Sequence, residues 1–184
     1  MPVSTIPGAG ITSSTTLTTP IVSTTMGVGG ATPSTSGSGI TFPASQSAST
    51  DANTLDDYEE GTFTPTISGG ITAGTTTYTT QTGNYTKIGR LVTATIKVAY
   101  SAATGTGTLS IGNFPFTAAS GEHVGSVMVD NLDMTSAGSY ALYLNATQTL
   151  AQIYTSIDNG AVNATQVTNE SATIWATITY FTAT

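Results

Sequence analysis

The clearest regularity in the chain is an alternation of apolar and polar side chains in two segments. In residues 90–100 one face carries Val92, Ala94, Ile96, Val98 and Tyr100, and the other carries Thr93, Thr95 and Lys97. In residues 173–181 one face carries Ile174, Ala176, Ile178 and Tyr180, and the other carries Trp175, Thr177, Thr179 and Phe181. A period of two residues is typical of a β-strand with one buried face. These segments therefore predict two strands of a sheet.

Shorter runs of the same kind follow one another between turn signals such as Gly69-Gly70, Gly83-Asn84 and Gly112-Asn113. The further strands expected are 62–67, 75–82, 85–88, 106–111, 114–118, 123–129, 140–145 and 149–156. No segment combines a 3.6-residue period with helix caps. Many short strands at regular spacing favour an all-β fold, an antiparallel β-sandwich of jelly-roll-like type.

Residues 1–53 have a different pattern. The first 50 residues carry no charged side chain and are dominated by Ser, Thr, Gly and Pro, so this segment has little apolar surface to bury on its own. Small apolar groups recur in it, and an extended segment of this kind docks on a partner through backbone pairing and a few side-chain anchors. We expect an anchoring arm at 1–53, an acidic junction at 54–61 and a β-sandwich domain at 62–184. The predicted anchors are Ile6, Ile11, Leu17, Ile21 and Val22.

Composition and charge narrow the range of functions. Charged residues make up 7% of the 184 residues, and ten acids against three bases give a formal net charge of −7. The bases, Lys87, Arg90 and Lys97, are too few to cover a phosphate backbone, so we expect no nucleic-acid partner. There is no cysteine, the N-terminus does not resemble a signal peptide, and no apolar run approaches the roughly 20 residues of a membrane span. We expect no membrane insertion and no cofactor.

Five of the ten acids fall within residues 51–60, in the segment TLDDYEEGTFTPT and just before it. A glycosidase needs two carboxylates about 5–10 Å apart across a sugar-binding groove, and no second acidic cluster faces this one. A Ca²⁺ loop needs regularly spaced oxygen ligands, and the spacing here does not match. The interpretation we favour is a solvated turn whose acids pair with basic residues of the same or a neighbouring subunit, leaving an intersubunit cation as an alternative. The candidates for intersubunit ionic contacts are Asp56, Asp57, Glu59, Glu60, Lys87 and Arg90.

Two residue types remain as candidates for chemistry or binding. His123 is the single histidine, and its neighbour Glu122 would point to the opposite face of a strand, so we expect a histidine at a strand start and no catalytic triad. The tyrosines fall in or beside the predicted strands, where they suit core packing, a subunit interface or a shallow carbohydrate surface. Gly61 is expected to allow a sharp turn before a core strand that begins at Phe63.

Two motifs together resemble a module found in tail-fibre and appendage proteins of tailed bacteriophages. The first runs over residues 27–67, where GSGITFP leads into NTLDDYEEGTFTP, and the second is GNYTKIG at 83–89 with Val92. The resemblance covers residue 27 to about residue 100. It implies a virion appendage, commonly a homotrimer, with no enzymatic role for the acids. Fibres of this kind usually carry long attachment and shaft regions ahead of the module, whereas this chain has only about 50 residues there.

From the residues and the resemblance together we expect a structural virion protein and no enzyme. Its form would be a trimeric capsid decoration (cement) protein or a short-fibre subunit, docked by its arm to the major capsid protein or another virion component. The expected location is the capsid exterior, with the tail as second choice. The alternative is a tail-fibre tip that binds a host surface glycan or a protein receptor.

Overall fold

The computed structural model describes residues 25–132, 138–168 and 170–183, and these are built from strands, turns and loops with no helix. No segment of this part of the chain forms a helix long and apolar enough to cross a membrane. The chain divides into two compact units, Met1–Pro43 and Ala44–Thr184, which are described separately below.

The described part of the first unit contains one small parallel pair of strands. Strand β1 (Thr25–Gly27) pairs with β2 (Gly39–Thr41), and Val28 N–H extends the ladder by donating to the Thr41 carbonyl at 3.0 Å. The turn after β1 uses Gly29 and Gly30, both with positive φ. The predicted anchors at Ile6, Ile11, Leu17, Ile21 and Val22 lie outside the described residues.

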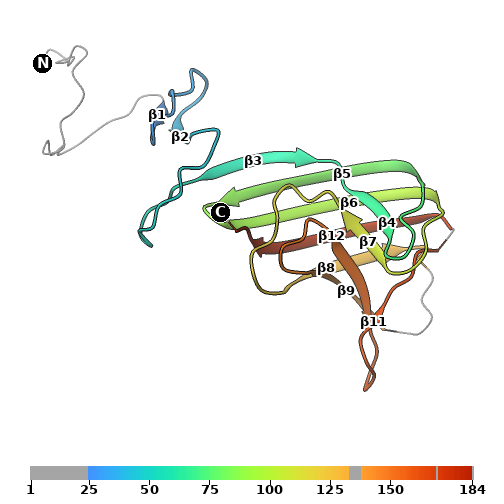
Figure 1. The fold of residues 1–184 in the computed structure, drawn as a ribbon. Helices are drawn as coiled ribbons and strands as arrows, with labels where there is room; N and C mark the ends of the chain where they lie inside the picture. The colour runs from blue at the N-terminus through green and yellow to red at the C-terminus, as the bar shows by residue number, and fades with distance from the viewer. Residues whose placement is uncertain (1–24, 133–137, 169, 184) are drawn as a thin grey trace, which may run out of the picture. The chain divides into compact units, whose positions relative to one another are not determined.

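The second unit is a single antiparallel sheet (Figure 1). Its strands are β3 (Tyr58–Phe63), β4 (Thr66–Gly69), β5 (Thr76–Ile88), β6 (Leu91–Ala103), β7 (Leu109–Gly112), β8 (His123–Asp130), β9 (Ser139–Leu144), β10 (Ala151–Ser156), β11 (Asn163–Ala164) and β12 (Ala172–Phe181). They follow the order β3-β5-β6-β12-β8-β9-β10-β7-β4, and β11 pairs with β10 outside this path. The predicted all-β antiparallel fold is confirmed, while its jelly-roll connectivity stays a prediction.

The sheet curls so that β4, the last strand of the order, approaches β5 near the start of the order. Ile67 N–H of β4 donates to the Tyr78 hydroxyl of β5 at 2.6 Å, and Gln81 Nε2 of β5 donates to the Pro65 carbonyl at 2.9 Å. These side-chain bonds satisfy backbone groups at the edge of β4 that have no strand beside them. Two walls of one sheet therefore enclose a common core, which makes the unit sandwich-like.

The core is formed by the alternating faces that the sequence predicts. The inward rows of β6 and β12 are buried throughout: Val92, Ala94, Ile96, Val98, Tyr100, Ile174, Ala176, Ile178 and Tyr180. Ile67, Ile111, Leu142 and Ile153 reach the same core from the opposite wall. Aromatic rings close one end, with Phe114 lying 5.8 Å from Phe63 and 6.0 Å from Tyr180 between ring centroids.

Three predicted strand boundaries are wrong. The predicted strand 62–67 is two strands, β3 and β4, because Pro65 between them has no N–H to donate to a ladder. The predicted strands 75–82 and 85–88 are one strand, β5, which runs straight through Gly83. Residues 114–118 form no strand and contribute only a single bridge, between Ala118 and Thr182.

Candidate functional site

The NTLDDYEEGTFTP segment of the first motif and the GNYTKIG motif lie on neighbouring strands. In the β3–β5 ladder Glu59 is opposite Lys87, Gly61 is opposite Tyr85, and Phe63 is opposite Gly83. The NTLDDYEEGTFTP segment and the GNYTKIG motif therefore form one antiparallel pair of strands. The sharp turn expected at Gly61 is absent, because Gly61 lies in the middle of β3 with the Tyr85 ring covering it.

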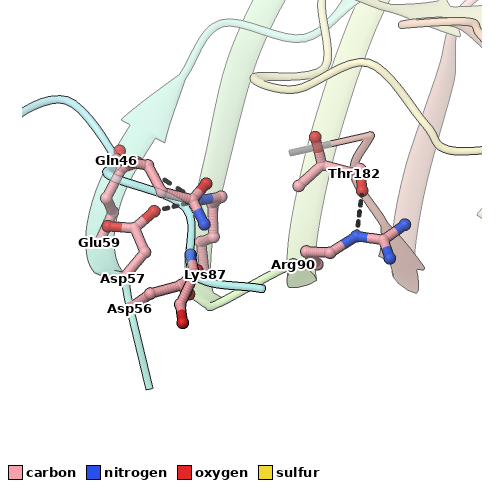
Figure 2. Close-up of polar contacts among 8 residues, drawn as sticks. Gln46, Asp56, Asp57, Glu59, Lys87, Arg90 and Thr182 are labelled. Carbon is pink, nitrogen blue, oxygen red and sulfur yellow. Dashed lines mark hydrogen bonds and ion pairs between the residues drawn. The ribbon is translucent and has the colours of Figure 1, made fainter. Parts of the chain in front are cut away.

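A buried ion pair joins the two motifs. Lys87 Nζ contacts Asp57 Oδ2, and the two side chains are only 3% and 1% exposed (Figure 2). Gln46 Oε1 accepts a second hydrogen bond from Lys87 Nζ at 3.1 Å, and Glu59 Oε1 lies 3.7 Å from the same nitrogen. The Phe116 ring covers the ammonium group at 5.4 Å from its centroid. We call Gln46, Asp57, Glu59, Lys87 and Phe116 the lysine cluster.

The backbone positions Asp57 for this contact. Gly89 N–H, in the turn between β5 and β6, donates to the Asp57 carbonyl at 2.9 Å. Asp57 Oδ1 is buried and has no hydrogen-bond partner among the described residues. The acids were expected in a solvated turn, but Asp57 is buried. Its pairing with Lys87 is made within one chain, and intersubunit contacts of this cluster stay a prediction.

Glu60 and Arg90 make their contacts outside the lysine cluster, whereas Asp56 lies at its edge, within reach of Gln46 and Lys87. Asp56 accepts the Ser49 N–H at 2.7 Å, and this bond lowers the pKa of the Asp56 carboxyl. Glu60 accepts a hydrogen bond from the Tyr58 hydroxyl, which raises the pKa of Tyr58. Arg90 Nε donates to the Thr182 carbonyl at 3.1 Å (Figure 2), which ties the β5–β6 turn to the end of β12.

Neither a triad nor a metal centre is assembled in the described part of the chain. His123 is the first residue of β8, as expected, and its ring packs 6.2 Å from that of Tyr180. Within residues 25–132, 138–168 and 170–183 there is no group of three or more His, Cys, Asp or Glu side chains that could hold a metal ion.

An apolar row crosses four strands on the outer face of the sheet. The register places Tyr58 beside Ile88, Ile88 beside Leu91, and Leu91 beside Phe181. These side chains are 41%, 48%, 37% and 51% exposed, respectively. We call these four residues the outer row. Sequence reasoning did not identify it, although apolar residues on the polar side of the alternation, such as Leu91 and Phe181, are a signal for such a surface.

A tyrosine-lined hollow occupies the outer face of β8, β9 and β10. It has a volume of about 450 Å³ and is lined by Val124, Ala141, Tyr143, Tyr154, Ser156 and Val162. The rings of Tyr143 and Tyr154 meet edge to face, 5.6 Å apart and at 77°. A hydrogen bond to Glu122 raises the pKa of Tyr143. The tyrosine hollow offers aromatic surface with polar groups at its margin.

Comparison with known proteins gives one similar structure. No family model matches the chain. No curated protein sequence matches it either. Among solved structures, the chain is similar to the Dettilon tailspike protein with a TM-score of 0.55 and 21% identity, over 67% of this chain and 24% of that chain. The match spans less than a quarter of the tailspike, and likeness at this identity shows a shared fold alone.

Proposed function

We propose that this chain is a structural protein of a tailed-phage virion, either a trimeric capsid decoration protein or a short-fibre subunit. The observation that carries the proposal is the fold, which over 67% of the chain resembles part of a phage tailspike. The β3–β5 ladder, formed by the segments that resemble phage-appendage motifs, adds support. In this role residues 1–53 anchor the subunit to the major capsid protein or another virion component, and the β-domain projects from the virion surface.

The outer row supports self-association of the β-domain. An exposed apolar row across four strands is bordered by threonines such as Thr93 and Thr179, and by one charged side chain, Glu60, which accepts a hydrogen bond from Tyr58. It offers apolar area with little charge to desolvate. Three copies packing such rows together would form a homotrimer, and each arm would then add its own weak contact to the particle. Several shallow contacts made by linked chains give high avidity without a deep binding site.

Deletion of residues 1–43, which leaves Gln46 and Ser49 in place beside Lys87 and Asp56, tests the anchoring role of the arm. Particles lacking the protein are incubated with the full chain or the truncated chain, and bound protein is quantified per particle. We expect the full chain to reach saturation and the truncated chain to bind weakly. A truncated chain that decorates particles to full occupancy would contradict the proposal.

The tyrosine hollow favours a second function, recognition of a host surface glycan by a fibre tip. Sugar rings present apolar C–H faces that pack on aromatic side chains, while hydroxyl groups bond to polar atoms at the rim. Binding of the purified protein to host cells should then be lost in Tyr143→Ala and Tyr154→Ala. Ile71→Ala is the control, because Ile71 is exposed and lies outside both the hollow and the outer row. Binding that survives both substitutions would exclude the hollow as the receptor site.

We assign no enzymatic role to the acids. Asp57 is engaged with Lys87, and Asp56 and Glu60 are held by local hydrogen bonds. This arrangement provides no pair of carboxylates facing each other across a groove, which glycoside hydrolysis requires.

A further inference from the structure

We propose that Asp57 and Lys87 become joined by an intramolecular isopeptide bond, formed without a helper enzyme, between Asp57 Cγ and Lys87 Nζ. The inference starts from the lysine cluster, where an amine and a carboxyl group are in contact and removed from solvent. A buried ion pair alone stabilises a fold only weakly, because both charges lose their hydration and gain a single attraction in exchange. The lysine cluster also holds a second carboxylate, Glu59, near the amine, and this combination suits amide formation between Lys87 and Asp57.

The geometry holds the reacting atoms together. Lys87 Nζ contacts Asp57 Oδ2, one atom away from the carbon that it would attack. Gln46 Oε1 at 3.1 Å holds the nitrogen from another side, and the Phe116 ring covers it. Asp57 itself is fixed through its carbonyl by Gly89 N–H and through β3, which begins at the next residue.

The second carboxylate supplies a route for protons. Glu59 Oε1 lies 3.7 Å from Lys87 Nζ, and its side chain is 32% exposed, whereas Asp57 and Lys87 are almost fully buried. Glu59 therefore borders both the reacting nitrogen and the solvent. It can carry a proton between the nitrogen and the departing oxygen, and it marks the side from which a water molecule can leave.

The reaction is a condensation that needs no oxidant or other reagent. A proton first passes from the ammonium of Lys87 to the carboxylate of Asp57, which leaves a neutral amine and a carboxylic acid. The nitrogen lone pair then attacks Cγ and forms the N–C bond. Glu59 takes a proton from the nitrogen and delivers it to Oδ2, the C–Oδ2 bond breaks, and one water leaves. The net change converts one ammonium and one carboxylate into one amide and one water, with Oδ1 as the amide oxygen.

Two physical effects favour the reaction. Well-oriented groups within one molecule react with effective molarities of about 10⁵–10⁸ M, so holding the amine against the carboxyl group lowers the barrier to attack. Amide formation also removes both charges from a site where charge is costly. Asp57 Oδ1, buried and without a partner among the described residues, would no longer be part of a charged carboxylate.

Trypsin cleaves after lysine and arginine, and the chain has only three such residues, so a digest reports directly on the bond. An acylated lysine is not a cleavage site, so the denatured, crosslinked chain is cut after Arg90 and Lys97 but not after Lys87. We expect a fragment ending at Arg90 whose mass is one water below that of its sequence. Cleavage after Lys87 into fragments of unmodified mass would overturn the proposal.

Substitutions at the two reacting residues identify the bond. Asp57→Ala and Lys87→Arg should give chains of unmodified mass. Asp57→Asn can still react at Cγ, but it would lose ammonia instead of water and reach the same product mass as the natural chain. A water loss that persists in Asp57→Ala would assign the mass change to another site and overturn the proposal.

Glu59→Gln tests the proton route, with Glu60→Gln as the matched control on the same strand. The crosslinked fraction is followed by mass in freshly synthesised protein over time. Since positioned acid–base groups contribute about 100-fold or more, we expect the bond to form at least about 100-fold more slowly in Glu59→Gln than in Glu60→Gln. Equal rates in the two variants would overturn the role of Glu59.

Discussion

At the scale of single residues, two buried tyrosines differ in how their hydroxyl groups are satisfied. The Tyr180 hydroxyl donates to the Phe116 carbonyl at 3.1 Å, whereas the Tyr100 hydroxyl is buried without a partner among the described residues. Both side chains are no more than 2% exposed. A buried polar group that lacks a hydrogen bond carries its full desolvation penalty, so the two hydroxyls contribute to stability with opposite sign.

Removing each hydroxyl should therefore have opposite effects. We expect Tyr100→Phe to raise the free energy of unfolding by about 1 kcal/mol and Tyr180→Phe to lower it by about 1 kcal/mol. Chemical denaturation of the two variants beside the natural chain measures both changes. A loss of stability in Tyr100→Phe equal to that in Tyr180→Phe would contradict the difference between the two sites.

The same tyrosines predict a loss of stability at high pH. Burial raises the pKa of Tyr100 and of Tyr180 to about 12, from an ordinary value of about 10. Between about pH 10 and pH 12 the unfolded chain releases these protons while the folded chain retains them, so the free energy of unfolding falls as pH rises through this window. Below about pH 10 the two groups contribute no pH dependence.

Denaturation at a series of pH values measures the effect. The double variant Tyr100→Phe, Tyr180→Phe should show a shallower decline above about pH 10 than the natural chain. Identical slopes would mean that the two tyrosines titrate alike in the folded and unfolded states.

At the scale of elements, the β3–β5 ladder depends on glycine opposite an aromatic ring. A Cβ on Gly83 would lie 2.6 Å from Phe63 Cε1, and a Cβ on Gly61 would lie 2.6 Å from the Tyr85 hydroxyl oxygen. The two pairs are reciprocal, since each strand provides one ring and one glycine. The rings fill the space that the missing side chains leave, which explains why both motifs contain a glycine within a strand.

A double-mutant cycle tests this packing. We expect Gly83→Ala to cost about 1–3 kcal/mol through overpacking against Phe63, and Phe63→Ala to cost about 3 kcal/mol. Combined, they should cost at least about 1 kcal/mol less than the sum, because the ring that blocks the new methyl group is gone. Gly70→Ala is the control, since its Cβ would meet its neighbours at ordinary distance, 3.4 Å or more. Strict additivity of the two changes would contradict the proposed contact.

The elements also show how far the sequence predicts the structure. The sequence predicts β12 and residues 91–100 of β6 because each keeps an alternation of apolar and polar side chains, which directly encodes one buried face. The last three residues of β6 depart from the alternation and lie beyond the predicted segment. The Gly83-Asn84 pair predicts a turn, because glycine usually marks one. The structure places Gly83 inside β5, where the Phe63 ring of β3 fills the space of the missing side chain, and that contact with a separate segment cannot be read from the local sequence. The burial of Asp57 was missed for the same reason, since Lys87, Gln46 and Phe116 reach it from separate segments of the chain.

At the scale of the whole molecule, the outer row predicts concentration-dependent association. Replacing Ile88 and Phe181 by threonine keeps β-propensity but removes exposed apolar area from the row. We expect the natural chain to sediment as a trimer and the double variant to shift toward monomer at the same concentration. Analytical ultracentrifugation measures the difference.

The matched control is Ile71→Thr, because Ile71 is 85% exposed but lies outside the outer row. This variant should sediment like the natural chain. A natural chain that is monomeric throughout the concentration range would contradict self-association, and loss of the trimer in the control alone would place the interface elsewhere.

The register of the outer row has a mechanical consequence. Tyr58 begins the first strand of the sheet, Phe181 ends β12, and both belong to one cross-strand row, so the polypeptide reaches and leaves the sheet at the same end (Figure 1). A force that pulls these two ends apart would unzip neighbouring strands one residue pair at a time and would not shear a whole ladder at once. Asp57 and Lys87 lie where the first pair would open, so their linkage determines the force at which the sheet begins to unravel.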